Sequence, residues 1–111
     1  MNSQFVLPVT EQTFENEVLH SALPVLIDVS TAWCAPCRLA ASVVAELARE
    51  HSGRLKVVAI DGDESPELVA KLGIRGFPTF LGYRGGERIE SQAGFAGKKK
   101  LAELSARLLS A

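Results

Sequence analysis

The stretch Trp33-Cys34-Ala35-Pro36-Cys37 constrains this chain more than any other. It holds the only two cysteines in 111 residues, three positions apart, and a helical pattern begins directly behind it. Side chains at i and i+3 on the first turn of a helix point the same way, so the two sulfur atoms can close a disulfide with little backbone movement. The free N–H groups and positive dipole end of that turn favour a thiolate at Cys34. The motif therefore predicts a pair that cycles between dithiol and disulfide, with Cys34 as the attacking sulfur.

Length and composition restrict the kind of protein in which this cysteine pair occurs. A chain of 111 residues that is 47% hydrophobic is expected to form one domain, spanning residues 1–111. It has no apolar run long enough to cross a bilayer, and a net charge of −1 gives no argument for nucleic acid or an anionic membrane. Residues 1–22 lack a basic start followed by an apolar block, so we expect a reducing, cytoplasmic location. In that setting a lone CxxC motif indicates redox chemistry rather than a structural crosslink.

Half of a structural zinc site is the main alternative for the two cysteines. Such a site needs four ligands, and the remaining candidates are His20 and His51. Both fall at the ends of predicted helices without the usual spacing of paired zinc ligands, so we expect no bound metal.

Apolar periodicity predicts strands alternating with helices. The expected strands are 5–7, 25–29, 55–60, 80–83 and 88–93, and the expected helices are 10–20, the stretch from the CxxC motif to 53, 65–72, and a last helix from 97. Thr10 and Ser65 are the predicted N-caps of two of these helices. The long helix between two apolar strands predicts a parallel crossover, and the Gly85-Gly86 turn predicts an antiparallel hairpin at a sheet edge.

Each helix is expected to bury one face. The predicted inward-facing residues are Phe14, Val18 and Leu19; then Leu39, Val43 and Leu47, with Ala40, Val44 and Ala48 beside them; and finally Leu101, Leu104, Leu108 and Leu109. Lys98-Lys99-Lys100 opens the last helix against its macrodipole, which indicates a solvated face or, alternatively, a surface for an acidic partner.

The order of these elements, the Trp-Cys-x-Pro-Cys motif at 33–37 and the Gly-x-Pro-Thr motif at 76–79 resemble the thioredoxin family. The resemblance covers nearly the whole chain. It implies an α/β protein with a central mixed β-sheet flanked by helices, ending in a β-hairpin and a helix. It also implies a protein-disulfide oxidoreductase that uses no bound cofactor.

The resemblance assigns roles to individual residues. Cys34 becomes the nucleophile and Cys37 the resolving thiol of the redox disulfide. Asp28 matches a buried carboxylate with a raised pKa that transfers the proton of Cys37. The alternative is a strand-edge carboxylate satisfied by backbone, but the place of Asp28 six residues before Cys34 among apolar neighbours favours the proton-transfer role. The peptide bond before Pro78 is expected to be cis, although from sequence alone trans would be the default. The residues expected to bind substrate are Trp33, Ala35, Pro36, Phe77, Pro78, Ala93, Gly94 and Phe95.

Four departures from the family pattern surround the motif. Ala35 replaces a glycine, Ser42 replaces a proline that often kinks the helix, and Ser30-Thr31 stands where an aromatic and a small residue are common. Ala59 falls where a lysine often neighbours the buried carboxylate. These changes bear on the redox potential and on the choice of partner.

The function expected from the resemblance is a monomeric reductant of disulfide-containing proteins that is recharged by a thioredoxin reductase. Pro36 supports this direction, because the strongly oxidising relatives usually place histidine before the second cysteine. Two alternatives remain open: a specialised oxidoreductase with one dedicated client, or a binding module that uses the apolar rim around Trp33 and Phe77.

Overall fold

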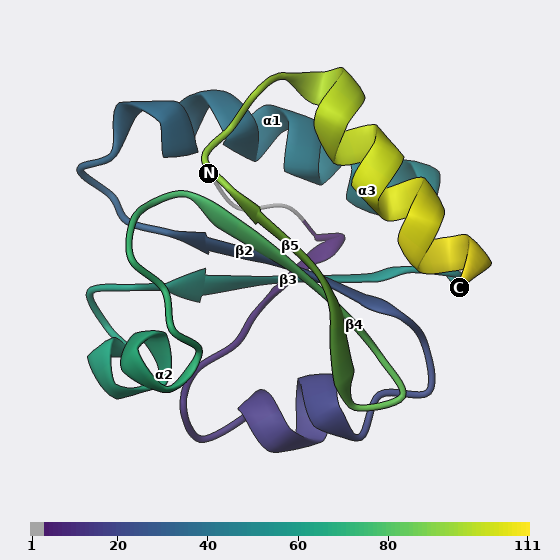
Figure 1. Cartoon of the computed structure of the whole chain (residues 1–111), viewed down its shortest axis with the longest axis horizontal. Helices are drawn as coiled ribbons and strands as arrows, with labels where there is room; N and C mark the ends of the chain where they lie inside the picture. Colours follow the sequence, from purple (N-terminus) through teal and green to yellow (C-terminus); the bar gives the residue numbers. More distant parts are fainter. Residues whose placement is uncertain (1–3) are drawn as a thin grey trace.

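The computed structural model describes residues 4–111 as a five-stranded sheet with helices on both faces (Figure 1). The elements in chain order are β1 (Val6–Pro8), η1 (Glu15–Leu19), β2 (Val25–Ser30), α1 (Ala35–Glu50), β3 (Lys56–Asp61), α2 (Pro66–Lys71), β4 (Thr79–Arg84), β5 (Glu87–Ala93) and α3 (Lys98–Ser110). This confirms the mixed α/β architecture expected from the sequence.

The sheet has the strand order β1-β3-β2-β4-β5. The pairs β1–β3 and β2–β3 are parallel, whereas β2–β4 and β4–β5 are antiparallel. The predicted crossover and hairpin are therefore both confirmed. Strand β2 lies at the centre, covered on both faces and paired on both sides, which explains its nearly continuous apolar sequence.

Two layers of side chains separate the sheet from its helices. Leu26 of β2 packs with residues of α1 and α3 on one face, while Ile27 packs with residues of η1 and α2 on the other. In Figure 1, α1 and α3 lie above the sheet and α2 lies below it. Because side chains alternate along a strand, Asp28 and Ser30 share the face of Leu26 and point toward the α1 layer.

The buried stripe of α1 differs from the expectation. Ala40, Val44, Leu47 and Ala48 are buried, but Leu39 is 69% exposed and Val43 is only partly buried. An exact four-residue repeat drifts around a helix that has 3.6 residues per turn, so the row at 39, 43 and 47 enters the core only at its end. The row one position later carries the packing.

The first helix is shorter than predicted. Phe14 and Val18 are buried as expected, with Leu19 packed beside them, but η1 is a π-helical turn in which the N–H of His20 bonds to the carbonyl of Glu15. Thr10 does not cap it. Instead, the Thr13 hydroxyl accepts the N–H of Thr10 at 3.0 Å and stabilises a separate turn.

The cap of α2 also comes from an unexpected residue. Ser65 occupies the N-cap position but makes no side-chain capping bond. The N–H of Leu68 donates instead to the Glu11 carboxylate at 3.0 Å. A carboxylate from 57 positions away thus satisfies a free amide at the start of the helix.

The last helix packs on the sheet as predicted. Leu101, Leu104 and Leu108 are fully buried, and Leu109 is partly buried. Of the three lysines that open α3, Lys98 forms an ion pair with Glu46 of α1 at 3.0 Å, while Lys99 and Lys100 are exposed.

Candidate functional site

The two cysteines lie at the N-terminus of α1. Cys34 is the N-cap residue and has an extended backbone, Cys37 lies in the first turn, and the two form a disulfide with their Cα atoms 5.2 Å apart. The Cys34 Sγ also accepts the N–H of Cys37 at 3.2 Å. The sulfur therefore occupies the position in which a capping group meets the free amides and positive end of the helix dipole.

The loop before α1 is held by bonds to its own carbonyl groups. The N–H of Cys34 donates to the Thr31 carbonyl at 3.4 Å, and the Arg38 Nη1 donates to the Ala32 carbonyl at 3.0 Å. Pro36 lies within the first turn, where a residue without an N–H loses no helical bond. These contacts fix the direction in which the chain enters the helix.

Asp28 is a buried carboxyl group on the same face of the sheet as this helix. It is only 6% exposed, and its strand partners are Ala59 on β3 and Phe80 on β4. The Ser30 hydroxyl donates a hydrogen bond to Asp28 Oδ1. Burial raises the pKa of Asp28 to about 6, partly offset by this hydrogen bond, which favours the charged form.

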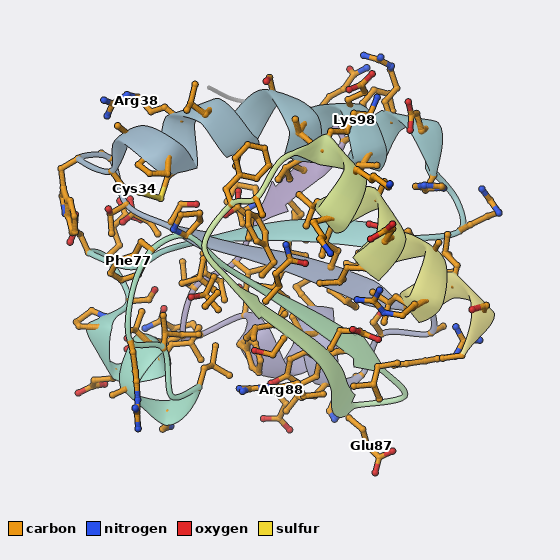
Figure 2. All side chains as sticks on the ribbon, turned by 45° about the horizontal axis from the view of Figure 1, so that its top comes forward. Cys34, Arg38, Phe77, Glu87, Arg88 and Lys98 are labelled. Carbon is orange, nitrogen blue, oxygen red and sulfur yellow. A yellow bond between two sulfur atoms is a disulfide. The ribbon has the colours of Figure 1, made fainter. Side chains whose placement is uncertain are left out.

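Two aromatic rings pack together at the disulfide end of the molecule. Trp33, which precedes Cys34, is 66% exposed, and its ring meets that of Phe77 edge to face with centroids 5.9 Å apart. The Phe77–Pro78 peptide bond is cis, as the resemblance implied. Figure 2 shows Cys34 and Phe77 at one end of the molecule and Glu87 at the other. The cis peptide therefore lies on the disulfide side of the protein.

The remaining predicted substrate-binding residues come from three places. Ala35 and Pro36 are exposed at the start of α1. Ala93, at the end of β5, is exposed and pairs with Thr79, and the N–H of Gly94 donates to the Pro78 carbonyl at 2.8 Å. Phe95 is half-buried and turns toward Phe80, with ring centroids 6.4 Å apart. Gly94 is thus joined directly to the cis-proline segment, whereas the Phe95 ring faces the core.

Three further residues support the site and were not among the site residues predicted from the sequence. Ser30 binds Asp28, as described above, and the Trp33 Nε1 donates to the Asp63 carboxylate at 3.4 Å. A Cβ atom at Gly62 would lie 2.6 Å from the Phe77 ring, so only glycine leaves room for that ring. Only Ser30 left a signal in the sequence, because strand alternation puts it on the face of Asp28.

Residues 4–111 contain neither a candidate metal cluster nor a candidate membrane span. No cluster of three or more His, Cys, Asp or Glu side chains there has the arrangement of a metal site. No helix in that range is long and apolar enough to span a membrane.

Comparison with known proteins agrees with this geometry. The thioredoxin family model matches residues 5–107. The chain belongs to the thioredoxin family. It is 41% identical to thioredoxin 1 of Nostoc sp. over 95 residues, which cover 86% of this chain and 89% of the relative. It is 43% identical to thioredoxin 1 of Synechococcus elongatus over 94 residues, covering 85% of this chain and 88% of the relative.

A third relative bears on location. The chain is 41% identical to an M-type chloroplastic thioredoxin of Chlamydomonas reinhardtii over 95 residues, covering 86% of this chain and 68% of the relative. Relatives in this thioredoxin family therefore include a chloroplast protein. Family membership, together with the Cys34–Cys37 pair, makes this protein a thiol-disulfide oxidoreductase that acts on protein disulfides.

Proposed function

We propose that Cys34 is the nucleophile and Cys37 the resolving thiol. The observation that supports this order is the position of the Cys34 Sγ as the cap of α1, where it accepts an amide N–H and meets the positive helix end. The Cys34 thiolate attacks one sulfur of a substrate disulfide, forming a mixed disulfide and releasing the other sulfur as a thiolate. Cys37 then attacks the Cys34 Sγ and releases the second. Two electrons pass to the substrate, and the Cys34–Cys37 disulfide forms.

Asp28 is the proposed proton acceptor for Cys37. Its side chain points toward the helix that carries the cysteines, and its pKa of about 6 leaves it mostly ionised at neutral pH while still basic enough to take a proton. The Cys37 thiol must lose its proton before it can attack the mixed disulfide. A carboxylate with a raised pKa suits this step better than an exposed one.

The proposed substrate surface surrounds the disulfide. Trp33, Ala35 and Pro36 present exposed apolar area on one side. The backbone at Phe77 and Pro78 offers an edge along which an extended substrate segment can pair. Ala93, Gly94 and Phe95 complete the proposed surface beyond the proline.

The broader proposal is a reductant of protein disulfides that works as a single domain over residues 1–111. It needs no bound cofactor, acts as a monomer in the cytoplasm and takes its electrons from a thioredoxin reductase. Pro36 before the second cysteine supports the reducing direction. The serine and alanine that replace family residues beside Asp28 favour a second candidate, an oxidoreductase of the same chemistry with one dedicated client.

Insulin reduction tests these proposals. With dithiothreitol as electron source, the parent protein should accelerate insulin precipitation, and Cys34→Ser should abolish the acceleration. When pre-reduced Cys37→Ser is mixed with insulin after dithiothreitol has been removed, it should trap a mixed disulfide, because the first attack still occurs and the second cannot. If Cys37→Ser left no trapped adduct while Cys34→Ser did, the assigned order of the two thiols would be wrong.

The electron donor is tested by replacing dithiothreitol with NADPH and thioredoxin reductase. Equal turnover with either electron source supports the general reductant. Turnover with dithiothreitol alone supports the dedicated client and a different donor. A Cys34→Ser variant that preserved the cellular phenotype would instead support a binding module.

A further inference from the structure

Ser30 lies two positions after Asp28 on β2, so both side chains are on the same face of the sheet. That face is covered by α1, because Leu26 lies in one buried cluster with Ala40 and Val44 of the helix. On this face, Leu26 lies in the core, and Ser30 lies at the end of the strand from which the chain enters α1.

The cross-strand neighbours of Asp28 are apolar. Its strand partners, Ala59 and Phe80, carry no polar side-chain atom. Within residues 4–111, Ser30 supplies the one side-chain hydrogen bond that Asp28 receives. A buried carboxylate with a single donor depends on that donor for both its orientation and its charge.

Ser30 also borders solvent. It is half-buried and lines a pocket of about 320 Å³, together with Thr10, Thr31, Ala59 and Asp61. Asp28 is not among the residues that line this pocket. Ser30 therefore contacts the buried carboxyl group through its hydroxyl and also borders an opening to water.

We propose that Ser30 is a positioning residue whose hydroxyl orients the Asp28 carboxylate and sets the pH at which Asp28 takes up its proton. As a contribution to catalysis, this role rests on the proposed function of Asp28 as proton acceptor. The hydroxyl favours the ionised carboxylate and so keeps Asp28 able to accept the Cys37 proton near neutral pH.

The surrounding charges do not replace Ser30. Asp61 of β3 and Glu64 border the pocket, and α1 brings Arg38 and the cysteine pair to this end of the sheet. Across β4, the facing residue is Phe80. None of these side chains forms an ion pair with Asp28 in the described part of the chain, and Arg38 is engaged with a carbonyl group. Two effects change the pKa of Asp28: burial raises it, and the hydrogen bond from Ser30 lowers it.

The direct test is a carboxyl-carbon NMR titration of Asp28 in the disulfide form, in which neither cysteine titrates. In Ser30→Ala, burial is left unopposed, and the Asp28 midpoint should rise by about one pH unit. Ser30→Thr keeps a hydroxyl and should return the midpoint toward that of the parent. An unchanged midpoint in Ser30→Ala would overturn the proposal.

Thr31→Val is the matched control. Thr31 lines the same pocket, and its buried hydroxyl has no hydrogen-bond partner among the described residues. Thr31 follows the last residue of β2, and its hydroxyl makes no hydrogen bond to Asp28, so removing that hydroxyl should leave the Asp28 midpoint in place. A shift equal to that of Ser30→Ala would mean that any change in the pocket moves Asp28, and the specific role of Ser30 would be lost.

Thiol-exchange rates then separate this inference from the proposed function. The pH midpoint of exchange should move upward in Ser30→Ala, and Ser30→Ala should have no further effect in an Asp28→Asn background. If the NMR midpoint moved and the exchange profile did not, Ser30 would still set the titration of Asp28. The proposed role of Asp28 in proton transfer would then be the part that fails.

Discussion

The buried carboxyl group of Asp28 makes the folded protein sensitive to pH. Its pKa rises from 3.8 to about 6 on folding, so the native state holds its proton more tightly than the unfolded chain does. The stability that this proton confers is complete below about pH 4 and is lost as pH rises through about 6. At about 1.4 kcal/mol per unit, the loss is about 3 kcal/mol. We therefore predict that the stability advantage of Asp28→Asn over the parent grows by about 2.5 kcal/mol between pH 4 and pH 8, because the carboxyl group of the unfolded chain is still partly protonated at pH 4.

Urea denaturation of the disulfide forms across this pH range measures the difference. If the amide introduced by Asp28→Asn binds Ser30 less well than the carboxylate does, that cost in unfolding free energy is the same at every pH. The change of the difference with pH therefore reports only the titration of the Asp28 carboxyl group. A constant difference between the two proteins from pH 4 to pH 8 would show that Asp28 titrates alike in the folded and unfolded states.

At the residue level, the sequence predicted the cysteine pair and the buried acid because their spacing and apolar setting carry the information locally. Ser30 was interpreted only as a departure from the family pattern, although its position two residues after Asp28 placed it on the same face. The contact between Trp33 and Asp63 joins residues 30 positions apart, and no local pattern encodes it.

At the level of the elements, α1 offers a test of which leucines hold the fold together. Leu47 is 1% exposed in the core, and Leu39, on the same helix, is 69% exposed. Leu47→Ala should lower the free energy of unfolding by about 2–5 kcal/mol, because it removes buried methyl groups and leaves a cavity. Leu39→Ala removes the same atoms and should change it by less than about 0.5 kcal/mol.

Both variants replace leucine by alanine within α1, so the effect of helix propensity is the same in each. Urea or thermal denaturation of both variants gives the comparison. Equal losses for the two would mean that Leu39 is buried in solution, as its four-residue spacing with Leu47 predicted.

The helix ends show why element boundaries were harder to predict than element types. The apolar spacing in α3 was sufficient to predict that Leu101, Leu104 and Leu108 are buried. The capping of α2 by Glu11 and the turn at Thr13 depend on which polar group reaches a free amide in three dimensions. Residue type alone favoured Ser65 and Thr10. At α2 a carboxylate from 57 positions away supplied the cap instead, and before η1 a local bond between Thr10 and Thr13 formed a separate turn.

At the level of the whole molecule, the sequence predicted the parallel crossover and the hairpin, since each connects neighbours in the chain. It predicted β1 as a short peripheral strand, which the sheet order confirms, but not its partner on β3, where Val57 lies opposite Val6 and 51 positions later. A strand this short carries too few side chains to specify its neighbour, so its location depends on the completed sheet.

The strand order also predicts how stability is distributed. Strand β2 is paired on both sides and covered on both faces, and it leads directly into the loop that carries Cys34. Strand β5 pairs only with β4 and is largely exposed.

We therefore predict that, in native-state hydrogen exchange, β2 amides exchange with solvent only when the whole protein unfolds. Amides on the unpaired edge of β5 should exchange through local opening, which has a far lower free-energy cost. Comparison with the unfolding free energy from urea checks this. If β2 amides exchanged as readily as those of β5, the centre of the sheet would not be the rigid support on which the disulfide is positioned.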